Sequence, residues 1–315
     1  MRDPQPLASR PRRRRTAGLV AVALTTAVAG LTTVVAAAPQ ATAAAAPPSW
    51  SAPRPAPEAA VAASPWLRAP GAPPTVIAHR GASSAAPENT LIAGEVARRG
   101  GAVWIENDVQ PSKDGVPYVL HDRTVDRTTD GTGPIRSLTS AQLDVLDAGS
   151  WFAPAYAGTR VPTLAAQLAD LRERGGNLLL EIKGQHGRAE VARIVQEVRD
   201  QDMTDRVFVQ SFDVSSLRYT RELAPELPLG LLRDTLDADP VAVAEELDLT
   251  SYNVSDKALS TRPELVPELH AAGVAVHVWT VDRPARWKVL DDLGVDGIIT
   301  NRPTELGGWS AGRTA

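Results

Sequence analysis

Two histidines and a pair of acidic residues stand close together in the first recognisable part of the chain. His79 and His121 each end a short apolar run, and Glu106 and Asp108 lie two positions apart in the segment VWIENDV. That segment is typical of a strand, in which residues two apart point to the same side. Two carboxylates on one face of a buried strand repel each other unless a positive charge lies between them, and a cation is the simplest source. Together with Arg80, these residues predict a site for hydrolysing a phosphate ester.

The elements that would position these residues alternate along the chain. The segments predicted as strands are 75–79, 103–109, 116–121, 178–183, 207–212, 228–233, 250–255, 274–281 and 295–300. The segments predicted as helices are 89–100, 163–174, 188–201, 214–223, 238–247, 262–272 and 283–293. Strands that alternate with helices indicate parallel βαβ units. The strand segments are apolar on both faces, which is typical of strands covered by helices.

The third strand segment, 116–121, is one too many for an eight-stranded barrel. The connection before it is too short for a helix and contains Asp114-Gly115, a hairpin turn signal. We therefore predict that 116–121 folds back on the second strand and that 122–162 is an insertion above the barrel mouth. The predicted fold is a TIM (β/α)8 barrel with a small insertion after strand 2. An open doubly wound sheet is the alternative, but no Gly-rich dinucleotide fingerprint follows the first strand.

Polar residues gather at the carboxyl ends of the predicted strands, where active sites of this fold lie. Glu181 and Lys183 are again two apart, in LLLEIK, so both side chains can face the barrel axis. The residues at these ends are His79-Arg80, Glu106, Asp108, Glu181, Lys183, Gln210, Ser211, Phe212, Trp279 and Asn301. A random scatter of polar residues would not favour one end of otherwise apolar strands.

This ordered set of motifs resembles the glycerophosphodiester phosphodiesterase family of phospholipase C-like barrels. The matching segments are AHRGASSAAPENTLIAG, the acidic pair in WIENDVQPSKDG, LHDRTVDRTTDGTG, LEIK, VQSF, VWTVD and DGIITNRP, and they cover 75–303. The resemblance implies metal-dependent hydrolysis of glycerophosphodiesters to glycerol 3-phosphate and an alcohol. It implies a divalent metal held by Glu106, Asp108 and Glu181, with His79 and His121 as the catalytic acid–base pair.

The residue types agree with that chemistry. Carboxylate-only ligation suits Ca²⁺ or Mg²⁺ better than zinc, and imidazole can take and give a proton near neutrality. We expect Arg80 and Lys183 to bind the phosphate and Trp279 to line the substrate pocket. We expect His121 to be the acid, although the sequence leaves that order open. It also leaves open whether water attacks directly or a substrate hydroxyl first forms a cyclic phosphate.

Two other functions fit parts of the pattern. A phospholipase D-like lyase acting on lysolipids or sphingomyelin would share the paired histidines and the metal, but the chain lacks its distinctive C-terminal sequence. A catalytically inactive binding barrel is opposed by the intact acidic and histidine set.

Two further residues are expected to have supporting roles at most. Asn89 is expected either to cap the first helix or to tie down the loop that follows His79. Asn301 stands where the family usually has Asp, so any charge role there is in doubt.

Composition limits the partners of this protein. The chain has 315 residues, no cysteine and a formal net charge of −4. The absence of cysteine excludes disulfides, thiolate metal sites, cysteine nucleophiles and lipidation on Cys. The charge gives no general reason to expect a nucleic-acid partner. We expect a small-molecule glycerophosphodiester or lysolipid substrate, while the oligomeric state stays open.

The segments outside the barrel are predicted from composition. Residues 1–43, with a basic start, an uncharged span and small-residue cleavage sites, are typical of a signal peptide. We expect cleavage, secretion and no stable membrane span in the mature form. Without cleavage the span would anchor the chain in the membrane, and the export route, Sec or Tat, stays open. Residues 44–74 are predicted to be an Ala/Pro-rich linker from which Trp66 and Leu67 could dock, 75–306 the barrel domain and 307–315 a C-terminal tail.

Overall fold

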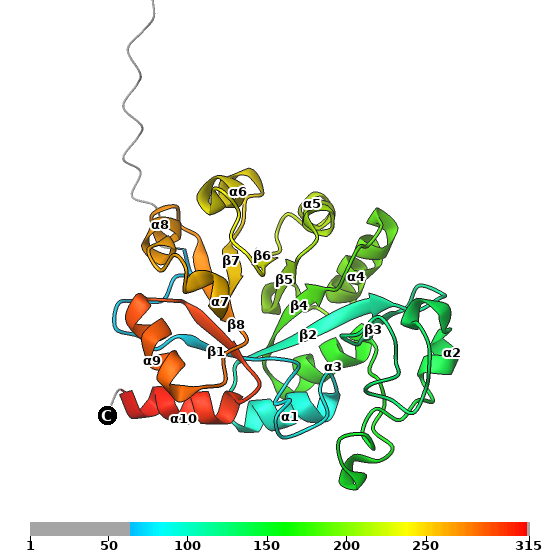
Figure 1. Cartoon of the computed structure of the whole chain (residues 1–315). Coiled ribbons are helices and arrows are strands. Elements are labelled where there is room, and N and C mark those ends of the chain that lie inside the picture. Colours follow the sequence, from blue (N-terminus) through cyan, green and yellow to red (C-terminus); the bar gives the residue numbers. More distant parts are fainter. Residues whose placement is uncertain (1–63, 314–315) are drawn as a thin grey trace, which may run out of the picture. The chain divides into compact units, whose positions relative to one another are not determined.

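Eight parallel strands close into a barrel with helices around it (Figure 1). The computed structural model describes residues 64–313, so the predicted signal peptide and most of the predicted linker lie outside the described residues. The barrel strands are β1 (Thr75–Ala78), β2 (Trp104–Pro111), β4 (Asn177–Ile182), β5 (Val207–Ser211), β6 (Leu229–Arg233), β7 (Ser251–Ser255), β8 (Ala275–Trp279) and β9 (Gly297–Thr300). Strand β1 pairs with both β2 and β9, which closes the ring and confirms the predicted TIM barrel.

A hairpin return follows β2, as the turn signal predicted. Strand β3 (Pro117–Val119) runs antiparallel to the end of β2, with Val109 opposite Val119. The insertion that follows contains the short helical turns η1 (Ile135–Ser137), α2 (Ser140–Leu143) and η2 (Pro154–Tyr156). It has its own hydrophobic core, which is made of Tyr118, Leu120, Val125, Ile135, Leu143, Ala148 and Val161. This core gives the chain around His121 a packed support of its own.

The helices follow the predicted order with a few differences. Their bounds are α1 (Leu91–Arg99), α3 (Leu164–Arg174), α4 (Arg188–Asp200), α5 (Val214–Leu223), α6 (Pro240–Glu246), α7 (Asp256–Leu259), α8 (Leu265–Ala271), α9 (Pro284–Leu293) and α10 (Pro303–Arg313), with the short turn η3 (Thr204–Arg206) before β5. Helices α7 and α10 were not predicted, and residues 307–313, expected in a tail, belong to α10. Side-chain caps favour several helix starts: Thr90 accepts from the backbone N–H of Ala93, and Thr163 accepts from that of Ala166.

Side chains alternate in direction along each barrel strand, so the strands contribute to one core under the helices and to another inside the barrel. In β4, Leu178 and Leu180 pack among the helices, whereas Leu179 and Glu181 point toward the barrel axis. The inner face is thus apolar near the amino ends of the strands and acidic near their carboxyl ends. The outer faces of the strands carry Val, Ile and Leu, which pack against the helices. This packing fixes the strands, and the strands in turn fix the position of each inner polar side chain along the barrel axis.

A short segment before the first strand covers the amino end of the barrel. The Trp66 ring packs edge-on against Phe208 and Trp104, with ring centroids 4.9 Å and 5.6 Å away. The Arg68 guanidinium is fixed by an ion pair of 2.7 Å with Asp291. The expected docking at Trp66 is therefore present, and it closes the end of the barrel opposite the polar site. Within residues 64–313 no helix has the length and apolar character needed to cross a membrane.

Candidate active site

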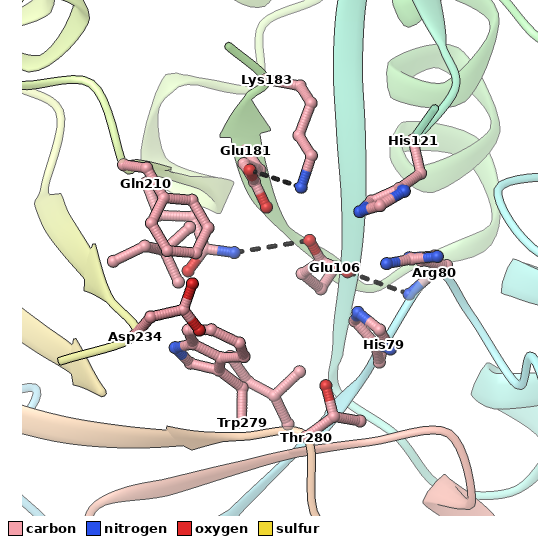
Figure 2. Close-up of a pocket in the computed structure, with 13 residues that line it drawn as sticks. His79, Arg80, Glu106, His121, Glu181, Lys183, Gln210, Asp234, Trp279 and Thr280 are labelled. Atoms are coloured by element: carbon pink, nitrogen blue, oxygen red, sulfur yellow. Dashed lines mark hydrogen bonds and ion pairs between the residues drawn. The ribbon is translucent and has the colours of Figure 1, made fainter. Parts of the chain in front are cut away.

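The carboxyl ends of the strands surround a cavity of about 290 Å³ that collects the predicted residues (Figure 2). Every predicted site residue except Asp108 lines it, and the cavity also includes residues that were not predicted to bind substrate. The lining residues are His79, Arg80, Glu106, His121, Glu181, Lys183, Gln210, Phe212, Leu232, Asp234, Trp279, Thr280 and Ile299. Asp108 is buried directly beside them, with 1% of its surface exposed.

Three carboxylates from two neighbouring strands converge in this cavity. The register of β2 and β4 places Asp108 directly opposite Glu181, and Glu106 lies two residues earlier on the same face of β2. One oxygen from each of the three side chains lies within 4.8 Å of the others. All three are buried, so their mutual repulsion is only weakly screened by water.

Titration behaviour reflects this crowding. Burial, and then the charge of Asp108, raise the pKa of Glu181 to about 8, and the same two causes raise the pKa of Glu106 well above its ordinary value. Burial also opposes ionisation of Asp108, but Lys183 and Arg80 outweigh it and hold the pKa of Asp108 below its usual range. Without additional positive charge, the cluster therefore keeps protons at neutral pH. The hard-oxygen donor set and the excess of negative charge fit a divalent cation such as Ca²⁺ or Mg²⁺.

Two basic side chains lie against the carboxylates. The Lys183 ammonium is 2.9 Å from Glu181 and 3.3 Å from Asp108, and Arg80 Nε is 3.3 Å from Asp108. The backbone N–H of Arg80 also donates to Glu106 at 3.0 Å. Arg80 adopts a left-handed backbone conformation, with φ of 56°, which is uncommon for a residue other than glycine. Two cations opposite three carboxylates leave one negative charge uncompensated when all are ionised.

His79 is oriented by a residue from the last strand end. Its Nδ1 lies 2.7 Å from the Asn301 side-chain oxygen, and the Asn301 amide nitrogen donates to Asp282 at 2.7 Å. Because that second bond fixes the amide with its oxygen toward the ring, Nδ1 must carry the proton and Nε2 is left as the basic atom. Burial, reinforced by Arg80, lowers the pKa of His79 to about 4, so the ring is neutral at pH 7.

His121 is oriented by the residue that follows it. Its Nδ1 lies 2.7 Å from the Asp122 carboxylate, and Arg127 holds that carboxylate at 2.6 Å. The side-chain amide of Gln110 lies 2.7–3.0 Å from the backbone carbonyl oxygens of three consecutive residues, Leu120, His121 and Asp122. The end of β2 therefore fixes the height at which His121 lies above the carboxylates.

Ion pairs connect the two histidine-bearing loops. Glu88 accepts from Arg127 at 2.8 Å and from Arg80 at 2.8 Å, so that it joins the insertion to the loop after β1. Arg80 in turn contacts Asp108 of the carboxylate cluster. Such a network limits the independent movement of His121 relative to the cluster.

Several supporting residues were missed or given another role in the sequence analysis. The N-cap of α1 is Thr90, whereas Asn89 donates from its side chain to Asp108 at 2.9 Å, which corrects the expected capping role. Asn301, where a charge role was in doubt, acts through its amide oxygen on His79. Asp122, which contacts His121, was the residue that local sequence could have indicated, because it directly follows that histidine. The contacts of Asn89 with Asp108 and of Asn301 with His79 join residues that are distant in the sequence.

The opposite side of the cavity is aromatic. The rings of Trp279 and Phe212 meet edge to face with centroids 5.5 Å apart, and the Lys183 ammonium lies 5.7 Å from the centroid of Phe212. In Figure 2, Asp234 lies beside Trp279, on the other side of Glu106 from His121. Trp279 therefore lies where the sequence analysis expected it, in contact with the space a substrate would occupy.

We expect Asn301→Ala to change the tautomer of His79. Loss of the acceptor removes the reason for the proton to stay on Nδ1, so the fraction of the ring protonated at Nε2 should rise. Imidazole ¹⁵N chemical shifts measured at pH 7, where the ring is neutral, report this fraction. Asn301→Asp, which retains an acceptor, should keep the proton on Nδ1. An unchanged tautomer in Asn301→Ala would show that Asn301 does not control the ring.

Comparisons with known proteins agree with this geometry. Residues 79–305 match the model of the glycerophosphoryl diester phosphodiesterase family. A glycerophosphodiester phosphodiesterase of Caldanaerobacter subterraneus is 37% identical over 232 residues, covering 72% of this chain and 94% of that protein.

Solved structures give the same result. The glycerophosphodiester phosphodiesterase of Agrobacterium tumefaciens aligns with a TM-score of 0.67 and 33% identity over 75% of this chain and 99% of that one. An Oleispira antarctica phosphodiesterase, solved with the product sn-glycerol-3-phosphate, aligns with a TM-score of 0.71 and 31% identity over 75% and 96% of the two chains. A family match over most of the barrel, with the acidic cluster in place at its mouth, shows that this chain belongs to the glycerophosphoryl diester phosphodiesterase family of enzymes.

Proposed function

We propose that this enzyme hydrolyses glycerophosphodiesters to glycerol 3-phosphate and an alcohol, with His79 and His121 as the acid–base pair beside a divalent cation. One observation carries the proposal: two histidines, each oriented through Nδ1, line the same cavity as a buried cluster of three carboxylates. Paired imidazoles and a cation suit phosphodiester hydrolysis, in which one oxygen loses a proton and another gains one. The product bound by the Oleispira relative supports the assignment of glycerol 3-phosphate.

The cation would be held by Glu106, Asp108 and Glu181, and we propose Ca²⁺ or Mg²⁺ because the donors are all carboxylates. When bound, it supplies positive charge that stabilises the developing negative charge on the phosphoryl oxygens. The high pKa values of Glu106 and Glu181 support this role, since a cation replaces the protons that the cluster otherwise keeps. Arg80 and Lys183, already directed at the cluster, add charge on the same side.

We assign His79 as the base and His121 as the acid. A low pKa leaves the His79 ring neutral at neutral pH with Nε2 free, which suits a group that accepts the proton of the attacking oxygen. The Asp122 carboxylate accepts from Nδ1 of His121, which leaves Nε2 as the atom that would give a proton to the departing alkoxide. The attacking oxygen belongs either to water or to a hydroxyl of the glycerol moiety, and His79 has the same role in both cases.

The glycerol moiety is assigned to the aromatic side of the cavity. Trp279 and Phe212 offer apolar ring surface to its carbon atoms, and the Asp234 carboxylate can accept hydrogen bonds from its hydroxyls. This places the departing alcohol on the side of His121, which agrees with the role of that residue as the acid.

Chelation provides a direct test of the cation. Dialysis against EDTA should abolish release of glycerol 3-phosphate from glycerophosphocholine, and addition of Ca²⁺ or Mg²⁺ should restore it. Glu181→Gln should raise the metal concentration needed for half-maximal activity by roughly tenfold or more, because one anionic ligand is lost. Full activity after complete chelation would contradict the proposed role of the metal. Analysis of products by ³¹P NMR distinguishes glycerol 3-phosphate from the cyclic phosphate that a lyase would release.

The histidines are tested separately. His79→Ala and His121→Ala should each lower kcat for glycerophosphocholine by roughly 10²–10⁴-fold, the usual contribution of a general acid or base. His270→Gln is a matched control, because His270 lies on α8 and pairs with Asp296 outside the cavity. Retention of normal kcat in either alanine variant would exclude the two-histidine mechanism.

We further propose that the protein is exported after removal of residues 1–43. The basic start and uncharged span of that segment support this proposal. Expression in a bacterial host with an active export pathway should yield extracellular protein whose N-terminal sequence begins near Ala44. An intact N-terminus in the membrane fraction would instead identify an uncleaved anchor.

A further inference from the structure

A second cavity, of about 460 Å³, lies beside the candidate active site and shares one residue with it. Lys183 lines both cavities, and in the second it is joined by Arg123 and Arg136, two more basic residues. The rest of the lining consists of Gln110, Pro134, Gly184 and Gln185. Within residues 64–313 no acidic side chain lines it, so we call it the basic cavity.

Arg123 is the cation of the basic cavity whose charge is not compensated. Arg136 is paired with Glu190 at 2.7 Å, and Lys183 is paired with Glu181 at 2.9 Å. By contrast, the Arg123 guanidinium makes no hydrogen bond or ion pair with another residue in the part of the chain that the structure describes. An exposed, unpaired guanidinium in a cavity without carboxylates is available to bind an anion.

The backbone fixes the position of Arg123. Its carbonyl accepts from the N–H of Ile135 at 3.1 Å, and the neighbouring Thr124 forms a bridge to Pro134. On the other side, Gln110 binds the carbonyl oxygens of the residues just before Arg123, including that of His121. Arg123 is therefore attached to the same supported segment as His121 and lies two residues after it.

We propose that the basic cavity binds the alcohol part of the diester and favours alcohols that carry a second anionic group, a carboxylate or a phosphate, which Arg123 binds. The inference rests on the proposed function, in which His121 protonates the departing alcohol on this side of the active site. A guanidinium binds both anions through two parallel N–H donors. Asp234 on the opposite side of the active site would repel the same group. Charge therefore favours one orientation of an anionic substrate.

Two matched substrate pairs test the inference on the complete mature enzyme loaded with metal. Glycerophosphoserine differs from glycerophosphoethanolamine by one carboxylate, and glycerophosphoinositol 4-phosphate differs from glycerophosphoinositol by one phosphate. We expect kcat/KM to be roughly 5–20-fold higher for the anionic member of at least one pair, the range expected for a charge-assisted hydrogen-bonded contact at an exposed site. Preference within the first pair alone identifies a carboxylate as the ligand, and preference within the second alone identifies a phosphate.

Arg123→Gln should reduce the ratio of kcat/KM between the anionic substrate and its matched partner to nearly one. Arg123→Lys, which keeps the charge but not the two-donor geometry, should give an intermediate ratio. Arg172→Gln is the matched control: it removes the same charge from an exposed position near the end of α3, where the strands begin, and should leave the ratio unchanged. Raising the salt concentration should weaken the preference of the wild type, because the site is open to solvent.

Two results would overturn the inference while leaving the proposed function intact: no preference in either pair, or a preference that persists in Arg123→Gln. Either result counts against the inference alone when glycerol 3-phosphate is still released normally from glycerophosphoethanolamine. If none of the four substrates is hydrolysed by the metal-loaded wild type, the proposed function itself fails, and the inference fails with it.

Discussion

Burial of three carboxylates within 4.8 Å of one another is the constraint on which the barrel mouth depends. Charges so close and so poorly solvated are unfavourable unless cations or protons accompany them. Lys183 and Arg80 compensate part of the charge, Asn89 donates a hydrogen bond to Asp108, and the remainder fits a divalent ion. The cluster is thus unfavourable for folding by itself, and its geometry is that of a group of ligands that could hold a cation.

The barrel makes this cluster possible by separating functions along each strand. Outward residues such as Ile105 and Val109 join the core under the helices, while Glu106 and Asp108 between them face inward. Apolar inner residues fill the amino end of the barrel, where Trp66 covers it. Stability and chemistry therefore depend on different residues of the same strands, which is why loops at one end can change without loss of the core.

The insertion after β3 adds what the barrel strands cannot provide. It supplies Asp122 and Arg127 to orient His121, and it packs around a core of its own. Glu88 links it to the loop that carries Arg80, so the two halves of the site are joined by ion pairs. The same insertion supplies Arg123 to the basic cavity, and it is the segment to which we assign selection of the alcohol.

Much of this site could be predicted from the sequence, because strand periodicity alone places Glu106 and Asp108 on one face, and the Asp114-Gly115 turn makes the following segment a hairpin return. The same periodicity turned Glu181 toward the barrel axis, and the family motifs added the expectation that it binds a metal and that the two histidines are the acid–base pair. Only the tertiary structure decided which residues orient them: the Asn301 side chain that binds His79 lies 222 positions away along the chain. Such contacts depend on strand register and loop packing, which local sequence patterns do not encode.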